Sequence, residues 1–304
     1  MKPHTVISKR FAPYLMIFVA TTALAQDAAQ IELQVIPAAK NVYMISGAGG
    51  NIALLAGEDG ALIVDTGVPI PGLAEKIAAA VKKECDKPIR LVIDTHWHFD
   101  HVGGNEAFHE GGALIASHEN VRMRMSTEQY LAHIERKAEP SPAGALPAIT
   151  CDDEMSLHWN GDEIRIIHVP NAHTDGDSFV YFTKANVLHV GDTCFSGMYP
   201  YIDINAGGSI DGMIAAADRT LALANEQTRI IPGHGPLSTV EEVRAFRKML
   251  TTSKERVQAL IDAGKTRDEA IAAKPMSDLD EQWGKKAFKP DEWIAIVYDS
   301  LTKK

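Results

Sequence analysis

The chain has 304 residues, of which 45% are hydrophobic and 23% charged, and its formal net charge is −10. This composition is typical of a globular protein that can bury a substantial core. The acidic balance argues against nucleic acid as a partner, because phosphates need a basic surface.

The first 25 residues have the features of a secretory signal peptide. Cations precede an apolar stretch at 11–20, and small residues typical of a cleavage site end at Ala25. Pro13 and the shortness of this stretch argue against the alternative, a retained spanning helix, which needs about 20 apolar residues. We therefore predict cleavage after Ala25, a periplasmic or secreted mature protein (26–304), and no stable membrane insertion.

The first half of the mature chain, 26–137, places strands before helices. We predict strands at 31–36, 41–46, 51–56 and 61–64, with a turn at 58–60. Leu73, Ile77 and Val81 recur at helical spacing, and the apolar run 91–93 predicts a short buried strand. A strand at 113–116 and a mostly helical segment at 119–137 follow.

The second half, 151–250, repeats this order after a proline-containing loop predicted at 138–150. We predict strands at 163–169, 178–182, 186–190 and 229–231, and helices around 214–221 and 240–263. A tail, 251–304, includes a further helix at 291–301 and is packed on the body by Trp283, Phe288 and Trp293. Two such blocks predict a sandwich of two sheets with helices outside.

Four potential metal ligands directly follow the buried strand at 91–93: His96, His98, Asp100 and His101. In extended chain, residues two apart point the same way, so His96 and His98 can bind one ion. Asp100 and His101 come after a change of direction and cannot easily reach that ion. We therefore expect a second ion nearby, at a strand end of the kind where α/β proteins place their chemistry.

Three further candidates follow predicted strands in the second half: His173, Asp192 and His234. Each alone has an ordinary interpretation as a turn residue or helix cap. Their regular placement at strand ends argues for one shared site. The remaining histidines lie in ordinary contexts, and we predict no functional role for His4, His109, His118, His133, His158, His168 and His189.

The pattern His96-x-His98-x-Asp100-His101, followed by the three later candidates, resembles the ligand set of the metallo-β-lactamase-fold superfamily. The resemblance covers nearly all of the mature chain. It implies an α/β fold, an αββα sandwich of two mixed β-sheets flanked by helices, with metals at one edge of the sheets. It also implies a first metal held by His96, His98 and His173, a second held by Asp100, His101 and His234, and a bridging role for Asp192.

Imidazoles with a few carboxylates suit two zinc ions per chain, although iron or manganese is an alternative. Oxygen-reducing diiron relatives carry Glu at the position of His98, which disfavours redox chemistry. By resemblance, hydroxide formed between two metals attacks the carbonyl of a small-molecule substrate. Asp100 would be the catalytic residue that orients this nucleophile.

The predicted export favours a β-lactamase that opens the ring of β-lactam antibiotics. However, the best-known β-lactamase subclass has Cys at the position of Asp192, a residue other than His at His101, and a substrate-binding Lys at Phe195. Asp192 and His101 are more similar to the glyoxalase II thioesterase branch or the all-histidine lactamases. Hydrolysis of lactones, thioesters or other esters is therefore the alternative function. A non-catalytic metal-binding protein is a weaker alternative. A lactamase and an esterase would differ in the loops at 47–51, 138–150 and 202–210.

The three cysteines, Cys85, Cys151 and Cys194, can form at most one disulfide. Free thiols are the favoured interpretation for a chain of this size. We predict that Cys194 is a buried thiol and not a metal ligand, because Asp192 already completes the set.

Overall fold

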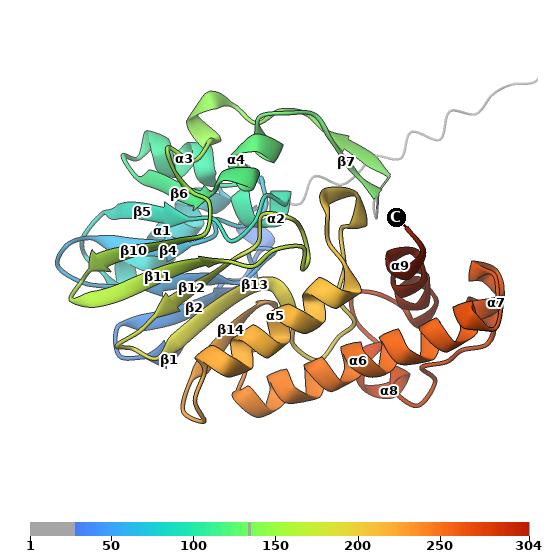
Figure 1. Ribbon diagram of the computed structural model, residues 1–304. Helices are drawn as coiled ribbons and strands as arrows, with labels where there is room; N and C mark the ends of the chain where they lie inside the picture. Colours follow the sequence, from blue (N-terminus) through green and yellow to red (C-terminus); the bar gives the residue numbers. More distant parts are fainter. Residues whose placement is uncertain (1–27, 133–134, 304) are drawn as a thin grey trace, which may run out of the picture.

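Two β-sheets lie face to face with helices on their outer sides, as Figure 1 shows for the computed structural model, which describes residues 28–132 and 135–303. The seven-stranded first sheet has the order β1-β2-β3-β4-β5-β6-β9, and the five-stranded second sheet has the order β10-β11-β12-β13-β14. This arrangement confirms the predicted sandwich of two mixed sheets flanked by helices.

The bounds of the elements follow the chain in order. The first sheet contains β1 (Gln34–Ala39), β2 (Val42–Ser46), β3 (Ile52–Leu55), β4 (Ala61–Val64), β5 (Ile89–Ile93), β6 (Leu114–His118) and β9 (Ile149–Cys151). The second sheet contains β10 (Glu154–Trp159), β11 (Asp162–His168), β12 (Ser178–Phe182), β13 (Val187–Phe195) and β14 (Arg229–His234). A separate hairpin is formed by β7 (Gln129–Leu131) and β8 (Arg136–Ala138). The helices are α1 (Leu73–Glu84), α2 (Phe99–Val102), α3 (Asn105–Glu110), α4 (Glu119–Met125), α5 (Ile210–Leu223), α6 (Val240–Asp262), α7 (Arg267–Ala272), α8 (Asp280–Trp283) and α9 (Pro290–Thr302).

Three apolar layers follow from the alternation of side chains along the strands. On β4, Leu62 and Val64 face the second sheet and pack in one cluster with Ile166 and Phe182. Ile63, between them, faces the opposite way, toward α1. Because β4 is buried on both faces, its sequence is a continuous apolar run without polar alternation.

The outer face of the second sheet is covered by α5 and α6, and α9 packs on these helices; all three share one cluster with β12, β13 and β14. Trp283 and Trp293 are buried there, which confirms their predicted role in packing the tail on the body. Phe288 is only partly buried. Within the described ranges, no helix combines the length and the apolarity needed to cross a membrane.

Parallel pairing brings the ends of β4 and β5 to one edge of the first sheet, and those of β13 and β14 to one edge of the second. The two edges meet through Asn51, which follows the Gly-rich turn before β3. Its Nδ2 donates to the carbonyls of Pro232 and Gly235, each at 2.8 Å. Side chains that follow these strands are therefore held against each other across the sandwich.

The predicted helix at 119–137 is wrong beyond residue 125. The helix α4 ends at Met125, and the hydroxyls of Ser126 and Thr127 donate to the Met123 carbonyl, which satisfies the helix end and allows the chain to turn into the β7–β8 hairpin. Four strands were not predicted: β7 and β8, which form the separate hairpin, and β9 and β10, each of which lies at the edge of its sheet. The first strand also begins later than predicted, at Gln34.

Candidate metal centre

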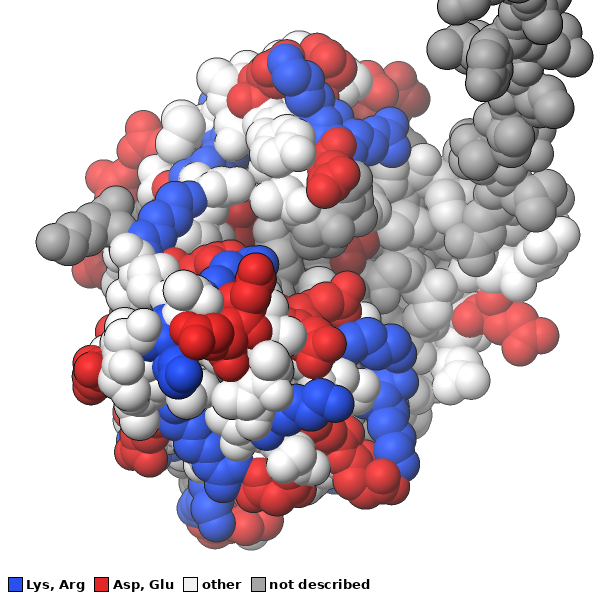
Figure 2. Space-filling view, turned by 90° about the vertical axis from the view of Figure 1, so that its right-hand side faces the viewer, with Lys and Arg blue, Asp and Glu red and all other residues white. Residues whose placement is uncertain are grey.

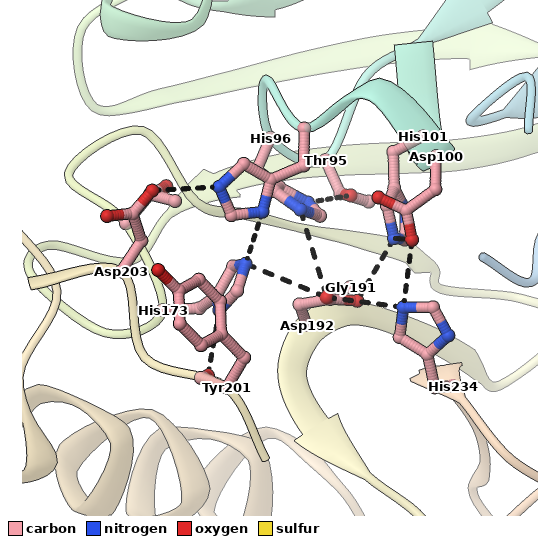
Figure 3. A network of polar contacts seen from close by, with 12 residues as sticks. Thr95, His96, Asp100, His101, His173, Gly191, Asp192, Tyr201, Asp203 and His234 are labelled. Carbon is pink, nitrogen blue, oxygen red and sulfur yellow. Dashed lines mark hydrogen bonds and ion pairs between the residues drawn. The ribbon is translucent and has the colours of Figure 1, made fainter. Parts of the chain in front are cut away.

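All seven residues predicted as metal ligands come together at the edge where the two sheets meet (Figure 3). They form two groups whose candidate ligand atoms lie within 4.8 Å of one another: His96, His98, His173 and Asp192 in the first group, and Asp100, His101 and His234 in the second. Each group combines residues from both halves of the chain. The sequence spacing alone could not predict how close the ligand atoms of the two halves lie.

Several elements position these side chains. His96 and His98 lie in the segment after β5, whereas Asp100 and His101 lie on the short helix α2, which makes the predicted change of direction. His173 follows β11, and His234 is the last residue of β14. Asp192 does not follow its strand as predicted but lies within β13.

A local irregularity in β13 directs Asp192 toward the site. The pairing of β13 with β14 shifts register at Gly191, whose φ of 52° is in the left-handed region. A bulge of this kind re-aims the next side chain. Gly233 on the adjacent strand allows the close approach, because a Cβ there would lie 1.9 Å from Asp192 Oδ1.

Asp192 contacts both groups. Its Oδ2 lies 3.6 Å from His173 Nε2 and 3.9 Å from His96 Nε2. Its Oδ1 lies 3.1 Å from His101 Nε2, and its Oδ2 is 3.4 Å from His234 Nε2. One carboxylate between two sets of imidazoles is the arrangement expected of a bridging ligand.

Asp65 orients the imidazoles of His101 and His96. His101 Nδ1 lies 2.8 Å from Asp65 Oδ2. The Thr95 hydroxyl donates to the same oxygen at 2.8 Å, so it can accept the hydrogen bond from His96 Nδ1 at 3.1 Å. In this arrangement the Nε2 lone pairs of both histidines point into the site, as is usual for histidines that bind metals.

Asp203 and the Tyr201 carbonyl orient the other two imidazoles of the first group. His98 Nε2 lies 3.0 Å from Asp203 Oδ2, and His173 Nδ1 lies 3.0 Å from the Tyr201 carbonyl oxygen. The remaining nitrogens, His98 Nδ1 and His173 Nε2, lie 2.8 Å apart. Each imidazole of this group is therefore fixed by the protein at its outer nitrogen.

The inner atoms of the site fit a cation. His96 Nε2, His101 Nε2 and Asp192 Oδ1 are buried without a hydrogen bond, and the only close polar contact among them is the 3.1 Å ion pair of His101 Nε2 with Asp192 Oδ1. Leaving such atoms without a partner costs free energy, so native proteins rarely do so without a functional reason. Imidazole nitrogens and carboxylate oxygens that converge in this way are the donors that zinc takes up.

The electrostatics of the two groups differ. Burial lowers the pKa of His173 to about 4, because it outweighs the opposing charge of Asp192. For His234, burial acts in the same direction, but the carboxylates of Asp192 and Asp100 outweigh it and raise the pKa to about 9. Burial opposes the charge of Asp192, yet His234 and His101 hold its pKa well below the usual value. The centre therefore keeps its carboxylates ionised and the first-group imidazole of His173 neutral.

The histidines for which no role was predicted lie outside both groups where the structure describes them. His118 and His168 stack on each other with ring centroids 3.7 Å apart, and His189 contacts the Asn51 carbonyl. His4 and His133 lie outside the described residues. Cys85, Cys151 and Cys194 are free thiols, as predicted, and burial raises the pKa of Cys194 to about 12.

Four residues that contact the ligands were not predicted as part of the site: Asp65, Thr95, Tyr201 and Asp203. Asp65 carried a detectable signal, because it directly follows the strand β4 in the way that the other candidates follow theirs. The structure adds that Asp65 has a φ of 66°, which is uncommon for a residue other than glycine. Asp203 carried no such signal, because it lies in an irregular loop.

Comparison with known proteins agrees with this geometry. Residues 45–238 match the family model of the metallo-beta-lactamase superfamily. The chain is 25% identical, over 86% of its length and 76% of the relative, to the 2,4-dinitroanisole O-demethylase subunit alpha of a Nocardioides species. It is 24% identical to the acyl-coenzyme A thioesterase MBLAC2 of Homo sapiens, over 66% of this chain and 78% of that protein. The solved metallo-beta-lactamase from Pontibacter korlensis matches this structure with a TM-score of 0.57, over 72% of this chain and 99% of that chain. The two sequences are 18% identical, so this similarity concerns the fold alone.

Proposed function

The chain belongs to the metallo-β-lactamase superfamily of metallo-hydrolases, and on this premise we propose that it is a dinuclear zinc hydrolase that cleaves an ester or a thioester. The observation that carries the proposal is the convergence of buried atoms without hydrogen-bond partners, His96 Nε2, His101 Nε2 and Asp192 Oδ1. These atoms belong to both groups of the centre, which supports two ions instead of one.

In this proposal His96, His98 and His173 hold the first zinc ion. Asp100, His101 and His234 hold the second, and Asp192 reaches both. Two zinc ions in such a site lower the pKa of water toward neutrality and polarise a carbonyl oxygen. The protein contributes fixed ligand orientations and a largely buried site.

Asp100 is the proposed positioning group for the attacking water. Burial opposes its charge, but His101 and His234 lower its pKa, so it is ionised at neutral pH. Its side chain is 20% exposed, and Oδ2 lies 3.2 Å from His234 Nε2. An ionised, partly exposed carboxylate can accept a hydrogen bond from water and direct its lone pair toward a substrate carbonyl.

Phe195 favours esters and thioesters over β-lactams. Its ring stacks on His234 with centroids 5.0 Å apart, so an apolar ring stands beside the second group where the best-known β-lactamases carry a Lys. That Lys holds the β-lactam carboxylate, and Phe195 cannot replace it. The sequence similarity to an acyl-coenzyme A thioesterase supports the same choice.

Opening of a β-lactam ring is the second candidate function. The similarity in fold to a solved metallo-beta-lactamase and the predicted export support it. The signal peptide proposed for residues 1–25 lies outside the described residues. Cleavage after Ala25 and a periplasmic or secreted location stay predictions, to be tested by N-terminal sequencing of the exported protein.

One substrate panel tests the proposal. The zinc-loaded protein would be assayed on a 4-nitrophenyl ester, an acyl-coenzyme A, a lactone, a penicillin, a cephalosporin and a carbapenem, each with and without a chelator. We expect chelator-sensitive turnover of the ester or thioester and two zinc equivalents per chain by elemental analysis. Turnover of β-lactams alone would overturn the ester assignment, and a reproducible single equivalent would overturn the dinuclear site.

A further inference from the structure

Beside the metal centre lies a pocket of about 550 Å³ between the loop that follows β13 and the tail helix α9. We propose that this pocket receives the apolar acyl chain of the substrate, so that the tail sets the chain-length specificity of the enzyme. The proposal rests on the proposed hydrolase function and names the substrate class more narrowly. The volume of the pocket is within the range of small-molecule sites, about 300–1,000 Å³.

Much of the wall of the pocket is apolar. This apolar part is formed by side chains from two segments far apart in the sequence: Tyr201, Ile202, Ile204, Phe288, Ala295 and Ile296. Phe288 stacks on Tyr201 with ring centroids 5.5 Å apart and an interplanar angle of 16°. The tail thus completes a wall that the loop after β13 cannot form alone.

Tyr201 belongs to both the pocket and the metal centre. Its carbonyl oxygen accepts the hydrogen bond from His173 Nδ1, and its ring centroid lies 5.8 Å from that of His173 and 6.1 Å from that of His98. Figure 3 shows the Tyr201 ring beside His173. Tyr201 therefore connects the wall of the pocket with the first group of the metal centre, and the proposed acyl chain would run along its ring from the centre into the pocket.

The charged side chains of the pocket already have partners. Arg267 Nε lies 2.9 and 3.1 Å from the two carboxylate oxygens of Asp299, and Lys303 donates to the Asn205 side chain. Glu292 accepts from the backbone N–H of Lys289 at 2.7 Å. The face in Figure 2 likewise mixes Lys and Arg with Asp and Glu and shows no single basic area. This pocket consequently suits an uncharged apolar group better than the carboxylate of a β-lactam.

A series of 4-nitrophenyl esters from acetate to decanoate, given to the zinc-loaded protein, tests the inference. We expect kcat/KM to rise about three- to fourfold for each added methylene until the pocket is full, as burial of methylene groups predicts. A rate that is independent of chain length, or that falls from acetate onward, would overturn the inference while leaving the proposed hydrolase in place.

Variants of Ile296 on α9 locate the effect. Ile296→Trp should reduce kcat/KM for decanoate more than tenfold and leave that for acetate unchanged, whereas Ile296→Ala should move the preferred chain to greater length. Asp291→Trp is the matched control, because Asp291 is exposed on the same helix and does not line the pocket. Equal effects of Ile296→Trp and Asp291→Trp would contradict the inference, and Ile296→Ala keeps the test valid if the larger residue prevents folding.

Binding of decanoate to the metal-free protein separates this inference from the proposed function. Calorimetry should detect binding to the unmodified chain and to Asp291→Trp but not to Ile296→Trp. Binding without any ester or thioester turnover by the zinc-loaded protein would overturn the proposed function and support the pocket. Turnover without decanoate binding would overturn the pocket and support the function.

Discussion

The two groups of the metal centre differ in how firmly the protein holds them. In the first group, His96 and Asp192 expose 1% and 5% of their side chains. In the second, His101 is fully buried beside Asp65, but Asp100 and His234 expose 20% and 24%. The outer nitrogens of His96, His98 and His173 all contact protein groups.

This difference indicates that the protein fixes the first group more firmly, and that Asp100 and His234 of the second group face solvent and substrate. Preorganised ligands lose little freedom on binding an ion, so the first group should bind zinc more tightly. The second group, with its ionised and exposed Asp100, is better placed to meet solvent and substrate.

Replacing the carboxylate that joins the two groups should have the largest effect. We expect Asp192→Ala to reduce kcat/KM by more than about 100-fold, because removal of a partner that only orients a ligand already costs 10–100-fold. Elemental analysis should show one zinc equivalent or less, with the second ion lost first. His109→Ala is the control, since His109 is exposed on α3, and it should retain both ions. Two equivalents retained by Asp192→Ala would contradict the bridging role.

A matched pair of substitutions separates the two groups. Asp65→Asn removes the charge beside His101 Nδ1, and Asp203→Asn removes the charge beside His98 Nε2. Each should weaken zinc by about 10–100-fold, as second-layer partners do elsewhere.

Stepwise chelator titration should show that Asp203→Asn affects mainly the tighter ion. Asp65→Asn should affect mainly the weaker ion, although it also reaches His96 through Thr95. Loss of the same ion in both variants would show that the two groups are not independent. Loss of neither would exclude a positioning role for Asp65 and Asp203.

Zinc uptake by the two groups should depend on pH differently. In the metal-free protein the pKa of His234 is about 9, so this imidazole is protonated at pH 7 and must release a proton to bind a metal. The pKa of His173 is about 4, so this imidazole is already neutral. The proton of His234 should therefore lower the affinity for the second ion about tenfold for each pH unit below 9. Calorimetry in two buffers with different ionisation enthalpies counts the released protons, and equal release for both ions would contradict the division.

The sequence predicted all seven metal ligands for clear physical reasons. Four of them lie within six residues of one another, and the two-residue period of extended chain already assigns them to two ions: His96, His98, Asp100 and His101. His173, Asp192 and His234 could be found because each lies close to the end of a strand or within its last residues. The sandwich followed from apolar strands buried on both faces, such as β4.

The residues that hold the ligands in place could not be predicted in the same way. Asp203 lies 105 positions from His98, and nothing in the sequence near it signals the contact. The acyl pocket depends in the same way on Tyr201 and Phe288 meeting across the fold. The strand β9 was missed because it has only three residues and ends the proline-containing segment predicted as a loop, and β10 was missed because its exposed and partly buried side chains alternate without an apolar run.

Phe195 provides the smallest test of the difference between the groups. Its ring stacks on His234, the most exposed histidine of the centre, with an interplanar angle of 24°. Phe195→Leu keeps the position apolar but removes an aromatic contact worth about 0.5–1.5 kcal/mol, so the second zinc ion should bind about 2- to 10-fold more weakly. The first ion, held by His96, His98 and His173, should be unaffected in a competition titration. A larger loss for the first ion would mean that Phe195 supports the centre through His173, whose ring centroid lies 6.3 Å from its own, instead of through His234.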